Sequence, residues 1–174
     1  MKNNLIAVAL LTSSAISTSA FAADGQVNFT GEIIDSACEV VNSPSNPLEV
    51  NMGRVNKTAF GGTGSTASAT QFALQLRNCP ATVSTASVKF DGTAVNGNRD
   101  VLALTSTSGV ATGVGIQLYD VSDSALPLAT PSMAYSLVSG MDNSLSFTAR
   151  YIQTAALVTA GPANATASFT VNYN

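Results

Sequence analysis

Apolar and polar side chains alternate along this sequence with a period of two residues. In the longest run, four apolar residues alternate with four polar or charged ones: Leu145, Phe147, Ala149 and Tyr151 against Ser144, Ser146, Thr148 and Arg150. Shorter runs of the same kind cover residues 71–77, 88–90, 102–104 and 114–119. Because successive side chains of a β-strand point to opposite faces, this period predicts strands with one buried and one exposed face.

Clusters of Pro, Gly, Asn, Asp and Ser separate these runs and predict turns. They lie at residues 43–47, 61–64, 91–92, 96–98 and 161–162. Short alternating strands separated by turns at intervals of roughly ten residues are typical of an antiparallel β-sandwich. We find no amphipathic helix and expect at most one helical turn, at residues 56–60. The sequence therefore predicts an all-β domain over residues 34–174.

The composition excludes several kinds of active site. The chain has no His, which removes His-based acid–base catalysis, Ser-His-Asp and Cys-His nucleophiles, and His-containing metal sites. Its two Cys residues cannot supply a four-thiolate zinc site or an iron–sulfur cluster. With 7 Lys and Arg residues and a net charge of −3, the chain offers no basic surface for nucleic acid. We therefore expect no enzyme, no metal or other cofactor, and no nucleic-acid partner.

Residues 1–22 have the parts of a secretory signal peptide. Lys2 supplies the positive charge, residues 5–11 are apolar, and Ala20-Phe21-Ala22 fits an A-x-A cleavage site. The apolar run is much shorter than the ~20 residues that a membrane-spanning helix needs, and we expect no membrane insertion. The exported chain is predicted to begin at Ala23.

The predicted export of the chain bears on whether its two cysteines are bonded or free. Cys38 and Cys79 are the only cysteines, so the chain allows one intramolecular pairing. Disulfides form and persist in oxidising compartments outside the cytosol, which favours a Cys38–Cys79 disulfide over two free buried thiols. No C-x-x-C motif is present, so nothing indicates thiol redox catalysis.

The alternation is sharpest at the two ends of the exported chain. At the N-terminal end the odd-numbered positions are apolar or small: Ala23, Gly25, Val27, Phe29, Gly31 and Ile33. At the C-terminal end Phe169, Val171 and Tyr173 alternate with polar residues as far as Asn174. A terminal strand with a bare edge invites pairing with another chain. We therefore expect the N-terminal segment of one copy to pair with the C-terminal strand of another, in a head-to-tail contact that propagates.

Five segments and two C-terminal positions form a recognisable set. The segments are GEIIDSAC at 31–38, FALQLRNC at 72–79, ATGVGIQLYD at 111–120, FTARY at 147–151 and ANATASF at 163–169. Tyr173 is the penultimate residue, and Gly161 is the fourteenth residue from the end. Together these features resemble the subunits of chaperone–usher fimbriae, in particular the type 1 fimbrial major-subunit group, over essentially all of residues 23–174.

The resemblance implies an incomplete immunoglobulin-like β-sandwich that lacks its seventh strand and is completed by a donor strand from another subunit. Residues 23–33 would be the donor arm, with the odd-numbered side chains entering the acceptor groove. The groove edge, which is also recognised by a periplasmic chaperone, would comprise Gly161, Phe169, Val171, Tyr173 and Asn174. The implied partners are neighbouring pilin subunits, this chaperone and an outer-membrane usher, and the implied location is the fimbria at the cell surface.

Several functions remain to be compared. A structural subunit that polymerises by donor-strand exchange into an adhesive organelle is favoured. Only two residues of the exported chain precede Gly25, as in the shorter arms of minor subunits, so a minor or adaptor pilin is an alternative. A single-domain sugar-binding fimbrial adhesin is another, although the tip adhesins of this family resemble two-domain chains. A secreted hydrolase is disfavoured by the lack of His and of a G-x-S-x-G motif.

Overall fold

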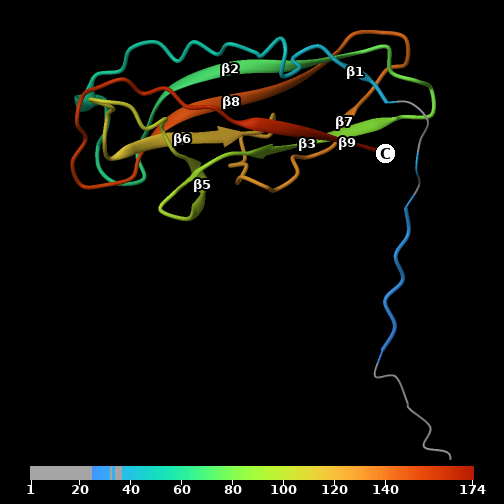
Figure 1. Ribbon diagram of the computed structural model, residues 1–174, viewed down its shortest axis with the longest axis horizontal. Coiled ribbons are helices and arrows are strands. Elements are labelled where there is room, and N and C mark those ends of the chain that lie inside the picture. Colours follow the sequence, from blue (N-terminus) through green and yellow to red (C-terminus); the bar gives the residue numbers. More distant parts are fainter. Residues whose placement is uncertain (1–24, 32, 34–36) are drawn as a thin grey trace, which may run out of the picture. The chain divides into compact units, whose positions relative to one another are not determined.

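The computed structural model describes residues 25–31, 33 and 37–174 of the chain (Figure 1). The chain divides into two units, residues 1–33 and residues 34–174, and each is described by itself. The predicted signal peptide and Ala23 lie outside the described residues. No helix in the described part is long and apolar enough to cross a membrane.

The described residues of the first unit form neither a strand nor a helix, although the alternation predicts a strand over residues 23–33. A strand needs backbone hydrogen bonds to a neighbouring strand. Residues 25–31 pair with no strand in the part of the chain that the structure describes. The side chains of Val27, Phe29 and Ile33 are exposed. The sequence pattern of this segment is therefore that of a strand, while the described part of the single chain holds no strand partner for it.

The second unit is all-β apart from one turn of 3-10 helix. Its strands are β1 (Glu39–Val40), β2 (Thr66–Arg77), β3 (Thr85–Asp91), β4 (Ala94–Val95), β5 (Asn98–Leu102), β6 (Val114–Tyr119), β7 (Tyr135–Ser136), β8 (Asn143–Gln153) and β9 (Ser168–Tyr173). The helical turn η1 (Lys57–Ala59) lies within the predicted 56–60 segment. It begins where the Asn56 side-chain oxygen accepts a hydrogen bond from the Thr58 backbone N–H at 3.1 Å.

The strands form two antiparallel sheets. The larger sheet has the order β1-β2-β8-β6-β5-β4, and the smaller has the order β7-β3-β9. The long strands β2 and β8 lie side by side in the larger sheet, while β9 lies against β3 in the smaller one (Figure 1). The predicted all-β sandwich is confirmed.

The core lies between the inward faces of the two sheets. In β8 the side chains of Leu145 and Phe147 are almost fully buried, whereas Ser144 and Ser146 are exposed, as the alternation predicts. Three aromatic rings from three strands meet there: Phe90 lies 5.0 Å from Phe147 and 6.1 Å from Phe72 between ring centroids. Aromatic side chains contribute large buried areas, so this cluster holds the two sheets together.

The apolar–polar alternation at the C-terminal end extends beyond the strand itself. β9 begins at Ser168, and the preceding residues 163–167 keep the alternation but do not pair in the ladder. Their backbone contacts loops instead, because the Asn164 carbonyl accepts a hydrogen bond from the Thr105 N–H at 2.7 Å. The local pattern is therefore that of a strand, while the neighbouring loop prevents regular pairing.

Cys38 and Cys79 form the predicted disulfide, which closes a sequence separation of 41 residues. Cys38 directly precedes β1 and Cys79 follows β2, so the bond fixes the two strands that begin the larger sheet. Both sulfur-bearing side chains are buried in the core cluster. The bond thus anchors the start of the domain to its interior.

Replacing Cys38 by Ser should lower the amount of subunit in the periplasm several-fold. Loss of a native disulfide typically costs ~2–5 kcal/mol of stability, and the Cys79 thiol would remain buried without its partner. Immunoblotting of periplasmic extracts measures the effect, with Thr82→Ala on an exposed turn as the control. Wild-type accumulation and normal assembly of the Cys38→Ser protein would contradict this role of the disulfide.

Candidate functional site

The backbone of β9 is hydrogen-bonded to a strand on one side only. Thr85 and Asn174 exchange two backbone N–H···O bonds of 2.9 Å at the end of the β3–β9 ladder. In an antiparallel ladder such doubly bonded pairs alternate with unbonded pairs, so the even-numbered residues of β9 face β3. The backbone groups that point away from β3 belong to the odd-numbered residues Phe169, Val171 and Tyr173. Along that edge, no other strand of the described chain pairs with β9.

The same odd-numbered residues direct their side chains toward the core. Phe169, Val171 and Tyr173 are half-buried and pack against the core cluster. The Phe169 ring lies 6.3 Å from Phe90 between centroids, next to the aromatic cluster. The edge therefore combines free backbone groups with apolar side chains that keep part of their surface exposed.

A second incomplete edge lies on the larger sheet. β1 pairs only with Leu76 and Arg77, which leaves residues 66–74 of β2 without a strand partner on that side within the described chain. The segment before β2 passes beside it, since the Ser68 hydroxyl donates to the Met52 carbonyl at 3.0 Å. Half-buried apolar side chains also lie in this part of the domain: Val40, Met52, Val55, Phe60 and Phe72. The core is thus incompletely covered on this side as well.

Tyr173 links the end of β9 to the beginning of the larger sheet. Its hydroxyl donates to the Cys38 carbonyl at 3.4 Å, which joins the end of β9 to the residue before β1. The phenol is protonated at neutral pH and acts as a donor, and burial raises the pKa of Tyr173 further. The arrangement can accept a segment that brings both backbone hydrogen bonds and apolar side chains.

Gly161 lies away from the edge of β9, at a close crossing of two backbone segments. A Cβ atom at this position would overlap the Gly109 carbonyl oxygen and lie 2.6 Å from the Ala111 nitrogen. The next residue secures the crossing, because the Pro162 carbonyl accepts a hydrogen bond from the Ala111 N–H at 2.9 Å. Gly161 therefore sets the path of residues 161–167, which lead into β9.

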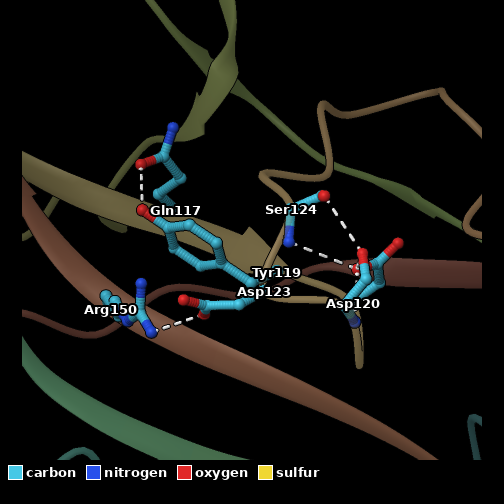
Figure 2. Close-up of polar contacts among 7 residues, drawn as sticks. Gln117, Tyr119, Asp120, Asp123, Ser124 and Arg150 are labelled. Carbon is cyan, nitrogen blue, oxygen red and sulfur yellow. Dashed lines mark hydrogen bonds and ion pairs between the residues drawn. The ribbon is translucent and has the colours of Figure 1, made fainter.

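A polar cluster occupies the outer face of the larger sheet (Figure 2). The Arg150 guanidinium lies 4.2 Å from the Tyr119 ring centroid and donates to the Asp123 carboxylate at 2.6 Å. The Tyr119 hydroxyl donates to the Gln117 side-chain oxygen at 2.6 Å. Each polar group in this chain of contacts is paired with another, so the cluster joins β6, β8 and the turn after β6.

The turn itself is organised by Asp120. Its carboxylate accepts hydrogen bonds from the N–H and hydroxyl of Ser122 at 2.9 and 2.6 Å, and from the Ser124 N–H at 3.4 Å. Burial of the carboxylate opposes ionisation, but these bonds and one from the Met133 backbone lower the pKa of Asp120. An open hollow of about 710 Å³ adjoins the turn. Among the described residues no group of His, Cys, Asp and Glu side chains could hold a metal ion. The hydrogen bonds of Asp120 stabilise the turn after β6.

Of the residues along the two incomplete edges, sequence reasoning named those of β9 and none in the segment before β2. Phe169, Val171 and Tyr173 follow a strict alternation, whereas Met52 and Phe60 lie in a segment with no regular spacing of apolar residues. That segment is mostly irregular, so neither a helical nor a strand period reveals which of its side chains turn inward. The one sequence signal for these inward-facing side chains is the presence of apolar residues between turn clusters.

The chain is similar to known fimbrial subunits over almost its whole length. A family model described as "Fimbrial protein" matches residues 27–174. The chain is 36% identical over 172 residues to long polar fimbria protein A of Salmonella typhimurium, covering 97% of this chain and 96% of the relative. It is 40% identical over 184 residues to the type-1 fimbrial protein, A chain, of Escherichia coli K12, covering 99% of this chain and 100% of the relative.

The fold is shared with a solved structure of a chaperone–usher pilus. The match has a TM-score of 0.65 at 24% identity and covers 87% of this chain and 96% of that chain. The fold therefore agrees with the incomplete sandwich that the sequence resemblance implies. With a family match that extends from residue 27 to residue 174 and near-full-length identity to two fimbrial subunits, this chain belongs to the fimbrial protein family.

Proposed function

We propose that this chain, a non-enzymatic structural subunit of fimbriae at the cell surface, polymerises when residues 23–33 of one copy pair with the open edge of β9 in the next. The observation that carries the proposal is the set of backbone groups of Phe169, Val171 and Tyr173, which point away from β3. An added strand would satisfy these groups and cover the half-buried side chains beside them, as in other cases of strand addition.

The length of the donor segment suits this role. At ~3.3 Å per residue, residues 23–33 would span about 36 Å as a strand, against about 20 Å for β9. The surplus would reach residues 163–167, whose alternation continues that of β9 and whose odd-numbered residues are also half-buried. One donor arm could therefore cover the incomplete edge from end to end.

The side chains of the donor segment supply the driving force. Phe29 is 93% exposed and Val27 is 74% exposed in the single chain. Burying such a side chain contributes ~1.5–3 kcal/mol, so the two together would stabilise a contact between copies. We expect Gly25 to occupy a shallow part of the acceptor site where a side chain would not fit, as the arm glycine of the family does.

Two assembly partners are part of the proposal. Before assembly, a periplasmic chaperone would supply a temporary strand to β9 and prevent premature association of the exposed edge. An outer-membrane usher would then be the site where the arm of the next subunit replaces the chaperone. We assign the subunit to the fimbrial shaft, because its near-full-length relatives include the A chain of type-1 fimbriae.

Replacing Phe29 by Asp should block polymerisation while leaving the chaperone-bound subunit folded. A carboxylate at an inward-facing position would have to be desolvated in an apolar site, which is strongly unfavourable. The matched control is Asn28→Asp, which places the same charge on the outward face and should be tolerated. Electron microscopy of surface fibres and co-purification with the chaperone measure the two effects. Equal effects at positions 28 and 29 would show that the inward register is wrong.

Appending a copy of residues 23–33 after Asn174 through a short flexible linker should give a monomer that resists heat. The linker makes donation intramolecular, at an effective concentration of roughly a millimolar. Thermal unfolding and size-exclusion chromatography of the exported chain, with and without the appended arm, measure the gain.

The control for the appended arm carries Asp in place of the copies of Val27 and Phe29, which should remove the gain. It keeps the length and linker of the self-complemented protein and removes only the apolar contacts. If the exported chain without an appended arm is already a stable monomer with the same unfolding midpoint, no incomplete edge is available and the proposal is wrong.

A further inference from the structure

A rigid loop with exposed apolar side chains lies beside the disulfide. In this disulfide-end loop, residues 137–142, Val138 is 54% exposed and Met141 is 63% exposed. The buried Asn143 holds the loop: its side chain accepts from the Val138 N–H at 2.7 Å and donates to the Val138 and Met141 carbonyls at 3.1 and 2.9 Å. The Ser139 hydroxyl donates to the Cys79 carbonyl at 3.0 Å. The loop therefore presents two apolar side chains in a fixed position.

A second loop of the same character lies at the other end of β8. In this far-end loop, residues 155–160, Leu157 is 82% exposed. The Thr159 side chain accepts a hydrogen bond from the Thr112 N–H at 2.9 Å, and the Thr159 N–H donates to the Thr112 carbonyl at 3.1 Å. The Gln153 side chain donates to the Ala155 carbonyl at 2.7 Å. These hydrogen bonds hold the far-end loop in place within the single domain.

The two loops are suited to a contact with each other in different copies. They cannot meet within one domain, because β8 separates them by about 36 Å at ~3.3 Å per residue (Figure 1). Residues 154–165 contain no charged side chain, and the one charged residue of the disulfide-end loop, Asp142, forms an ion pair with Arg77 at 3.2 Å. A contact of Val138 and Met141 with Leu157 would bury apolar side chains, which are typical of the centre of protein interfaces.

The donor arm limits where the next domain can lie. Residues 33 and 38 are five positions apart in the sequence, so their Cα atoms are at most about 18 Å apart even in an extended chain. The disulfide end of the donor domain must therefore lie close to the place where its arm leaves the acceptor. The disulfide-end loop adjoins Cys79, which is bonded to Cys38. This loop is thus among the first parts of the donor to meet the acceptor.

The direction of the arm decides which end of the acceptor it meets. Tyr173 lies at the disulfide end and Ser168 at the opposite end of β9. An arm antiparallel to β9 would leave the acceptor near Ser168, at the far end. An arm parallel to β9 would bring two disulfide ends together, where the acceptor's own arm departs. Antiparallel pairing avoids this crowding and is slightly more stable per residue.

We infer that successive subunits touch through these loops, with Val138 and Met141 of one copy packed against Leu157 of the copy that accepts its arm. The partner is a second copy of this chain, and the inference rests on the strand addition proposed above. Such a contact would be continuous with the arm and would fix the angle between neighbouring domains. Because both loops are held by hydrogen bonds, forming the contact would cost little conformational entropy.

Cross-linking in assembled fibres tests this contact. Fibres carrying Met141→Cys and Leu157→Cys, treated with a short bis-maleimide, should give a ladder of covalent oligomers, whereas unassembled subunits should give none. The matched control replaces Met141→Cys by Ser146→Cys, on the exposed outer face in the middle of β8, and should give no ladder. In a chain without added cysteines, Leu157→Asp should lower the temperature at which fibres release subunits while fibres still form.

The outcomes separate this inference from the proposed assembly. If the unmodified chain forms no arm-dependent fibres, strand addition itself is wrong. If fibres form but the 141–157 pair cross-links no more than the 146–157 pair, the loop contact is wrong and strand addition stands. If Leu157→Asp fibres resist heat as well as unmodified fibres do, the loop contact is also wrong. This test carries no added cysteines, so it decides the question even if the cysteine variants fail to assemble.

Discussion

The open edge of β9 is the constraint on which the rest of this structure depends. A strand that pairs on one side leaves half of its backbone groups without a strand partner, and here the same residues carry the incompletely covered side chains of the core. Phe169, Val171 and Tyr173 thus combine, along one strand edge, backbone groups without a strand partner and side chains that are only partly buried. An extended chain with alternating apolar residues would bond to these backbone groups and cover these side chains. The N-terminal segment of this protein has that pattern.

Several features hold the edge in place without covering it. The Cys38–Cys79 disulfide anchors the beginning of the domain, and the Tyr173 hydroxyl ties the end of β9 to the Cys38 carbonyl. At the other end, the close approach of Gly161 to the Gly109 backbone directs the chain into β9. The described residues leave no buried side-chain nitrogen or oxygen without a hydrogen-bond partner. The polar groups of the interior are therefore paired, and the unpaired strand backbone lies along the edges of β9 and β2.

The sequence predicts those parts of the fold that depend on local periodicity. The alternation in β8 and at Phe169, Val171 and Tyr173 is reproduced by their burial, because a strand with one buried face requires period two. Alternation alone does not show where β9 begins, since residues 163–167 alternate but bond to a loop. Met52 and Phe60 were missed because their segment is irregular. Under the assembly proposed above, residues 23–33 pair with another copy, so a single chain would show only their pattern.

Backbone amide hydrogen exchange along β9 tests the central claim most directly. The amides of Thr170 and Asn172 face β3, and they should be protected in both the unassembled subunit and the fibre. The amides of Phe169, Val171 and Tyr173 should exchange rapidly in the unassembled subunit and slowly in the fibre, where the arm of the next copy would bond to them. Protection of all five amides in both states, or rapid exchange of the three odd-numbered amides in the fibre, would contradict completion of this edge by a neighbouring chain.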